Sequence, residues 1–163
     1  MKIRVITKKN ILGLLISIAI AEGVGLLSAL LTMNTMDKYK LLEKPSFSPP
    51  GWVFPVVWSI LFLLMGIASY IVYSRGLDRK GVKSALLFYV IQLVFNLLWS
   101  IIFFRLGLRG LAFIWIIALL ILIIITTVKF FKISRPAGYL MIPYILWVIF
   151  ASILNLSIWL LNK

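Results

Sequence analysis

The sequence of 163 residues contains no cysteine and no histidine. Without these side chains, disulfides, thiolate nucleophiles, Cys/His metal sites and histidine-dependent catalytic triads are all excluded. Acidic residues are also scarce, because only four Asp and Glu oppose 17 Lys and Arg. We therefore expect no bound metal and no resident cofactor, and most enzyme classes are ruled out.

A net charge of +13 would suggest nucleic-acid binding in a soluble protein. The basic residues punctuate apolar runs, however, as juxtamembrane anchors facing anionic lipid headgroups do. Hydrophobic residues make up 63% of the chain, so an aqueous globule would have too little polar surface to cover them. The composition predicts an integral membrane protein that has the lipid bilayer, and no nucleic acid, as its partner.

Five apolar runs are long enough to cross a bilayer, which takes about 20 residues of helix. We predict an all-α membrane protein, a single domain over residues 1–163 that forms a five-transmembrane-helix bundle. The predicted helices cover 11–33, 52–73, 84–104, 110–128 and 137–161. Proline pairs bar a helix in the polar stretch 34–51, which we call loop 1. Pro143 is expected to kink the last helix by freeing the carbonyl of Tyr139.

The first apolar run also has features of a cleaved signal peptide, with a small-x-small site at Ala19 and Ala21 after a basic segment. The run continues about ten residues beyond that site, so we favour an uncleaved first helix. Because the basic N-terminus leads straight into a span, we expect a multi-pass protein of the cell (plasma) membrane.

Lys and Arg divide unequally between the two ends of the predicted bundle. Eleven lie in the N-terminal segment and in the stretches 74–83 and 129–136, against six in loop 1, in 105–109 and at the C-terminus. The positive-inside rule therefore places the N-terminus in the cytoplasm and loop 1 outside. The four N-terminal basic residues are Lys2, Arg4, Lys8 and Lys9.

Aromatic, small and polar side chains share one face of three predicted helices at a stride of about four residues. The stripes are Phe54, Trp58, Phe62, Gly66 and Tyr70, then Asn96, Trp99 and Phe103, then Pro143, Trp147, Ala151, Asn155 and Trp159. Lipid-facing positions are usually plain aliphatic, so these stripes are expected to face other helices or a cavity for a flat aromatic ligand. Core packing without a ligand is the alternative. Trp52 and Trp159, near helix ends, can also be interfacial belt residues.

Glu22 lies in the middle of the first predicted span, where a carboxylate costs about 3 kcal/mol on insertion scales. It must therefore be protonated, paired or facing water. An ionisable group at this depth indicates a function, and the alternative is a neutral structural acid that hydrogen-bonds a carbonyl or an Asn.

The segment from Leu42 to Trp58, LEKPSFSPPGWVFPVVW, resembles the signature of the TspO/MBR family, the tryptophan-rich sensory or translocator proteins. Further matches are FNLLW at 95–99, SRPAG at 134–138, and then Pro143, Tyr144, Trp147, Phe150, Ala151, Leu154 and Asn155. The resemblance implies a five-helix bundle, often a homodimer, in which loop 1 covers a pocket for porphyrins and for synthetic isoquinoline or benzodiazepine ligands. The implied ligand-binding residues are Tyr39, Phe54, Trp58, Phe62, Asn96, Trp99, Trp147 and Ala151.

The leading hypothesis is a membrane receptor, sensor or transporter that binds porphyrins and other planar apolar ligands. A macrocycle offers a π-face to Trp and Phe, and its propionates can meet Lys38, Lys40 or Lys44. Without His or Cys, ligation of haem iron would fall to Tyr or Met, so metal-free protoporphyrin should bind at least as well as haem.

Two alternatives remain open. In some members of the resembled family, the pair matching Trp58 and Trp147 is implicated in light-dependent breakdown of protoporphyrin, which would make these two residues catalytic. The other alternative is a proton-coupled small-molecule exporter that uses Glu22 as its ionisable switch.

Three positions depart from the family pattern. Trp115 stands where many members carry an acidic residue, which would alter the pocket wall or the dimer face. Leu111 stands where the animal members have a pocket Trp. Leu156 replaces the Tyr of the animal cholesterol motif, so sterol binding at that site is not expected.

Overall fold

The computed structural model describes residues 8–163, apart from the side chains of residues 8–10 and 36. Lys2 and Arg4, and the side chains of Lys8 and Lys9, lie outside this description, although the predicted orientation depends partly on them. The described residues form helices joined by short turns and contain no strand.

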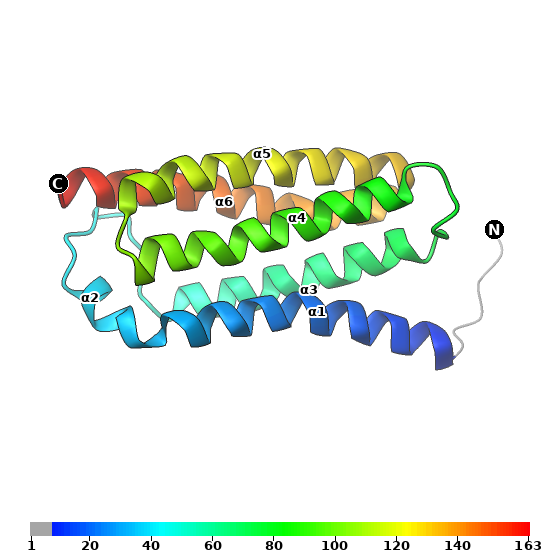
Figure 1. Cartoon of the computed structure of the whole chain (residues 1–163), viewed down its shortest axis with the longest axis horizontal. Coiled ribbons are helices and arrows are strands. Elements are labelled where there is room, and N and C mark those ends of the chain that lie inside the picture. Colours follow the sequence, from blue (N-terminus) through cyan, green and yellow to red (C-terminus); the bar gives the residue numbers. More distant parts are fainter. Residues whose placement is uncertain (1–7) are drawn as a thin grey trace.

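Five long helices run side by side along the long axis of the molecule (Figure 1). They are α1 (Lys8–Thr32), α3 (Val53–Tyr73), α4 (Val82–Ser100), α5 (Arg109–Ile133) and α6 (Arg135–Leu161). Each belongs to an apolar segment long enough to cross a membrane. The predicted all-α bundle of five transmembrane helices is confirmed.

Two short elements differ from the sequence prediction. A 3₁₀ turn, Met33–Thr35, and a short helix, α2 (Met36–Lys40), extend α1 into the stretch predicted as loop 1. Asp37 in the first turn of α2 and Lys40 in its last turn complement the helix dipole, and their side chains form an exposed ion pair at 2.9 Å. The other element is a π-helical turn, η2 (Ile101–Arg105), which continues α4 and includes a hydrogen bond from the Leu106 N–H to the Ile101 carbonyl at 2.9 Å.

Helix α5 ends at Ile133, five residues beyond the predicted end at residue 128. The charges of Lys129 and Lys132 favoured a loop there in the sequence, but the helix continues through them to the polar edge of the bundle. Helix α6 begins directly afterwards at Arg135 and runs through Pro143 to Leu161. Pro143 is therefore accommodated inside one continuous helical segment.

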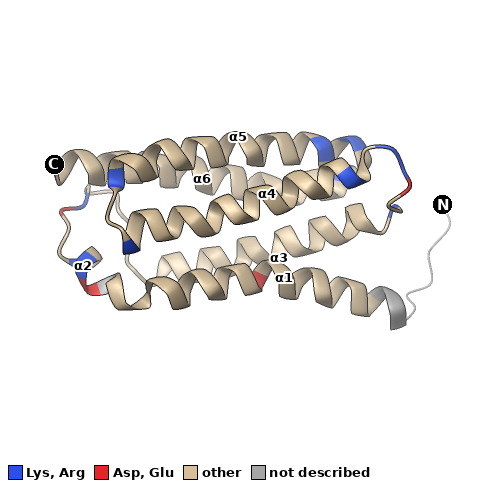
Figure 2. Ribbon diagram, in the orientation of Figure 1, with Lys and Arg blue, Asp and Glu red and all other residues tan. Residues whose placement is uncertain are grey.

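The helices form a bundle in which α5 packs along α4 and α6, while α3 packs along α1 and α6. Helix α1 lies at the edge of the bundle beside α3 (Figure 1). Large aliphatic side chains cover the outside, for example Leu12, Ile16, Ile114, Ile121 and Ile153. Charged positions gather at the two ends of the bundle, except for one acidic position midway along α1 (Figure 2). This distribution suits an apolar bilayer core between two polar surfaces.

Helices α1 and α3 approach each other closely at Gly66. A Cβ atom added there would lie 2.6 Å from the Ile18 Cα and 3.1 Å from the Ser17 carbonyl oxygen. Both neighbours are backbone atoms of α1, which cannot move away as a flexible side chain can. Small residues permit this kind of backbone contact, which replaces the hydrophobic driving force that lipid does not supply.

We expect Gly66→Ala to destabilise the folded protein by about 1–3 kcal/mol, because the added methyl group overpacks the α1–α3 contact. Thermal unfolding in detergent, followed by circular dichroism, measures the effect. Gly23→Ala is the matched control, since a Cβ at this helical glycine of α1 meets no atom within 4 Å. Equal melting temperatures for the two variants would contradict this account of the α1–α3 contact.

Candidate ligand-binding cavity

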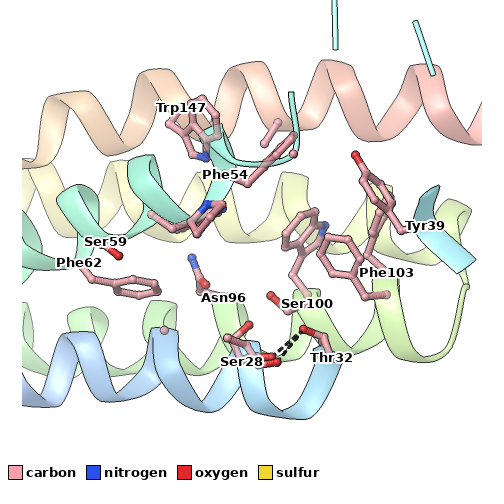
Figure 3. A pocket seen from close by; sticks show the side chains of 18 of the residues that line it. Ser28, Thr32, Tyr39, Phe54, Ser59, Phe62, Asn96, Ser100, Phe103 and Trp147 are labelled. Carbon is pink, nitrogen blue, oxygen red and sulfur yellow. Dashed lines mark hydrogen bonds between the residues drawn. The ribbon is translucent and has the colours of Figure 1, made fainter. Parts of the chain in front are cut away.

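A cavity of about 1180 Å³ lies between α1, α3, α4 and α6 and is closed at one end by α2 and loop 1. All eight residues predicted to bind a ligand line it: Tyr39, Phe54, Trp58, Phe62, Asn96, Trp99, Trp147 and Ala151. Figure 3 labels Tyr39, Phe54, Phe62, Asn96 and Trp147 of this set, and their side chains surround a common space. The cavity slightly exceeds the range of about 300–1000 Å³ that is usual for small-molecule sites.

Aromatic rings from five elements, α2, α3, α4, η2 and α6, line the cavity. The Phe54 and Trp147 rings lie 6.0 Å apart edge to face, so this pair joins α3 to α6. The Trp58 ring lies 5.6 Å from that of Phe62, one helical turn further along α3. Near loop 1, the Tyr39 ring of α2 contacts Phe104 of η2 at 5.3 Å. The edge-to-face and tilted pairs among these rings join the elements around the cavity.

A chain of buried hydrogen bonds fixes the polar floor of the cavity. The Asn96 side-chain amide donates to the Tyr144 hydroxyl at 2.8 Å, and that hydroxyl donates to the Gln92 amide oxygen at 2.9 Å. These two bonds link α4 to α6. Because each group is paired, Asn96 holds one orientation beside the cavity.

A second set of hydrogen bonds holds Trp99 in place. Its indole N–H donates to the Asn155 amide oxygen at 3.1 Å, and the Asn155 amide donates to the Arg109 carbonyl at 3.0 Å. Asn155 thus connects the end of α4 to the start of α5 through α6. It also lines the cavity, although the sequence analysis placed it only in a stripe.

Trp147 differs from Trp99 because its indole N–H is not paired. The Trp147 Nε1 atom is buried and has no hydrogen-bond partner among the described residues. The ring lines the cavity beside Phe54 (Figure 3). A buried donor without an acceptor costs about 1–3 kcal/mol.

The predicted stripes divide between the cavity and other helix contacts. On α3, Phe54, Trp58 and Phe62 line the cavity, whereas Gly66 and Tyr70 meet α1 at Ile18 and Gly13. On α6, Trp147, Ala151 and Asn155 line it, whereas Pro143 and Trp159 do not. Trp52 is 68% exposed at the start of α3, as an interfacial belt residue would be, and Trp159 packs over Gly110.

Several lining residues were missed by sequence reasoning. They are chiefly small or hydroxyl-bearing residues of α1, together with the last residue of α4 and one residue of η2: Gly25, Ser28, Ala29, Thr32, Ser100 and Phe104. The Thr32 hydroxyl donates to the Ser28 carbonyl at 2.8 Å (Figure 3). The feature of the sequence that could have predicted these lining residues is the run of small residues along this face of α1, which carries few aliphatic side chains.

Two lysines line the end of the cavity near loop 1. Lys40 pairs with Asp37, and the Lys44 ammonium donates to the Lys40 and Leu42 carbonyls at 3.1 and 3.2 Å. Of the three lysines predicted to meet acidic ligand groups, Lys40 and Lys44 line the cavity and Lys38 does not. Burial raises the pKa of the Tyr39 hydroxyl beside them above its ordinary value.

Loop 1 is fastened to the end of α6 by Asn162. The Glu43 N–H donates to the Asn162 amide oxygen at 3.0 Å, and the Asn162 amide donates back to the Glu43 carbonyl at 2.9 Å. A further bond from Asn162 to the Ile158 carbonyl, at 2.8 Å, holds the side chain against α6. Sequence reasoning had no signal for this residue, because the contact joins positions 119 apart.

The three departures from the family pattern do not line the cavity. Trp115 stacks on Phe95 at 4.6 Å, and its indole N–H donates to the Phe95 carbonyl at 2.9 Å, so it ties α5 to α4. Leu111 is 47% exposed. The expectation that Trp115 alters the pocket wall is therefore not supported by its position.

Five apolar spanning segments, four of which line a large cavity, define a multi-pass helical membrane protein. Comparisons with known proteins agree with this class. The TspO/MBR family profile matches residues 17–160. The chain is 39% identical to the tryptophan-rich protein TspO of Chlorobaculum tepidum, over 94% of this chain and 98% of that protein. It is 36% identical to the tryptophan-rich sensory protein of Cereibacter sphaeroides, over 76% of each chain.

The human translocator protein is 36% identical to the chain, over 74% of this chain and 72% of that protein. The chain belongs to the TspO/MBR family, as its loop 1 signature suggested.

We expect Asn162→Ala to loosen loop 1, because it removes both bonds to the Glu43 backbone. Hydrogen exchange of the amides in segment 42–48 should become about tenfold faster, the equivalent of losing roughly 1.4 kcal/mol of local protection. Ser157→Ala is the control, since the Ser157 hydroxyl bonds only within α6, to the Ile153 carbonyl. Unchanged exchange in the Asn162 variant would show that loop 1 is held by other contacts.

Proposed function

We propose that this protein is a membrane receptor, sensor or transporter that binds porphyrins and other planar apolar ligands in the cavity beneath loop 1. The observation that carries the proposal is the unpaired Trp147 indole N–H in an aromatic cavity of about 1180 Å³. A ring acceptor or a carbonyl on the ligand would satisfy that donor while the rings of Phe54 and Trp58 cover the ligand faces. The word "sensory" in the name of the Cereibacter sphaeroides relative supports a sensing role.

The ligand would lie with its acidic groups toward loop 1. Lys40 and Lys44 stand at that end of the cavity, and carboxylates of a porphyrin would form charge-assisted hydrogen bonds with them. The opposite, deeper part is lined mainly by apolar and aromatic side chains, with Glu22 as its charged residue, and the apolar walls suit the macrocycle. Entry and release of the ligand would then require movement of loop 1.

We also propose a setting for this activity. The protein would reside in the cell membrane with its N-terminus in the cytoplasm and loop 1 outside, as the distribution of basic residues indicates. Ligand would then reach the cavity from the outer side. A homodimer is proposed on the family resemblance alone.

Protoporphyrin should quench tryptophan fluorescence of the purified wild-type protein saturably in the dark. In Trp147→Phe the dissociation constant should rise about tenfold, the cost of roughly one hydrogen bond to the ligand. Trp159→Phe is the matched control, because it removes an indole from the same helix outside the cavity lining. Absence of saturable quenching in the wild type, or equal binding by the two variants, would refute the proposed site.

The alternative function, light-dependent porphyrin degradation, is favoured by the placement of Trp58 and Trp147 in one cavity. If this activity operates, illumination of the bound complex should bleach the porphyrin absorption bands. The double variant Trp58→Phe with Trp147→Phe should then bleach at least about tenfold more slowly at saturating ligand, because an electron donor is lost. Equal bleaching rates in wild type and double variant would remove this alternative.

A proton-coupled exporter is the other alternative, and it is favoured by Glu22, which lines the same cavity in the middle of α1. Transport in vesicles that survives Glu22→Gln would exclude a proton switch at this residue. Binding without any vesicle transport would leave a receptor or sensor.

A further inference from the structure

Glu22 is the carboxyl group in the deep part of the cavity. It lies ten residues before Thr32 on α1, a separation of about 15 Å at 1.5 Å per residue. Figure 2 shows this acidic position isolated on α1, far from the charged ends of the bundle. The side chain is partly buried and lines the cavity. Its charge therefore acts on the cavity and not on the membrane surface.

The carboxyl group has no partner within the described part of the chain. The ion pair found there joins Lys40 to Asp37, and Glu22 takes part in no hydrogen bond or ion pair with a described residue. The other charged lining residues, Lys40 and Lys44, lie at the loop 1 end and are engaged with Asp37 and with backbone carbonyls. A carboxylate at this depth costs about 3 kcal/mol when it is unpaired, so it is complementary to a positive charge brought by a ligand.

The surroundings of Glu22 select the kind of cation. Among the described residues no group of three or more Asp and Glu could hold a metal ion, and hard cations need six or more oxygen ligands. The rings of Phe62, Trp58 and Phe54 line the same cavity and attract cations through their π-faces. An ion whose charge is shielded by aryl groups fits such walls, because little hydration has to be removed.

We propose that Glu22 makes the deep part of this cavity a binding site for hydrophobic organic cations, of the aryl ammonium or aryl phosphonium class. The inference rests on the proposed ligand-binding role of the cavity and adds a second ligand class to it. The cavity then has two electrostatically distinct ends: lysines near loop 1 for acidic groups, and a carboxylate at depth for cationic groups. Affinity for the cation is set by one charge contact in a low-dielectric site together with the aromatic walls.

Tetraphenylphosphonium and tetraphenylborate provide the test, since they share size and shape and differ in the sign of the charge. Each is titrated against the full-length protein in nanodiscs, with tryptophan quenching as the readout, and protoporphyrin is titrated in parallel. The wild type should bind tetraphenylphosphonium saturably. Glu22→Gln, which is nearly isosteric, should weaken that binding at least about tenfold and leave tetraphenylborate and protoporphyrin within about threefold of wild type.

Two variants control for other effects of the substitution. Glu43→Gln makes the same chemical change at an exposed residue outside the cavity lining, and it should bind tetraphenylphosphonium like the wild type. Glu22→Asp keeps the charge and should retain most of the affinity. If Glu22→Gln does not fold, the contrast between the two probe ions on wild type and Glu22→Asp decides the question.

The outcomes separate this inference from the proposed function. Saturable protoporphyrin binding without tetraphenylphosphonium binding overturns the inference and leaves the porphyrin proposal standing. Equal tetraphenylphosphonium binding by wild type and Glu22→Gln also overturns it. Glu22-dependent cation binding without protoporphyrin binding supports the inference and refutes the porphyrin proposal, and absence of binding by both ligands refutes both.

Discussion

Polar links between helices are the constraint on which the rest of this structure depends, because lipid is as apolar as the helix surfaces and does not drive them together. Helices α4, α5 and α6 are joined by such links: Asn96 and Gln92 meet at the Tyr144 hydroxyl, Asn155 bridges Trp99 to the Arg109 carbonyl, and Trp115 reaches the Phe95 carbonyl. Helix α1 has no such link among the described residues and relies on its close contact with α3 at Gly66. The cavity lies between the linked helices and α1, so one wall is held by hydrogen bonds and the other by packing.

This division explains what each wall contributes. The hydrogen-bonded wall carries Asn96 and Trp99, whose polar groups are already paired and whose positions are therefore fixed. The facing wall of α1 carries small residues that make room and one unpaired carboxyl group. The cavity therefore has one side whose polar groups are fixed by hydrogen bonds and one side that is roomy and sparsely bonded.

The sequence predicted the helices because length and apolarity decide which segments can cross a bilayer. The family resemblance implied the eight lining residues, and the stripes at the helical period on α3, α4 and α6 contain all of them except Tyr39. The sequence analysis did not predict two features: a short helix within a turn-rich stretch, and a contact between two segments far apart in the chain. Helix α2 depends on charge placement within five residues, between Asp37 and Lys40, in a stretch dominated by turn formers. The clamp between Asn162 and Glu43 depends on the folded proximity of two segments far apart in the chain, which periodicity cannot reveal. A stripe of residues on one helix face also does not show which of them line a cavity and which contact a neighbouring helix. Phe62 and Gly66 belong to the same stripe, yet Phe62 lines the cavity and Gly66 contacts α1.

The π-helical turn at Ile101–Arg105 changes the helical phase of everything that follows it. Closing five residues instead of four in one turn inserts one residue, so side chains after it are rotated by about 100° relative to an uninterrupted α-helix. Phe103 and Phe104 are adjacent in sequence and would point about 100° apart in a regular helix, yet both line the cavity and both contact Tyr39. A regular helical wheel continued from α4 therefore places Phe103 on the face of Asn96 and Trp99, as the structure does, but it needs a correction of one residue for the positions that follow the π-helical turn.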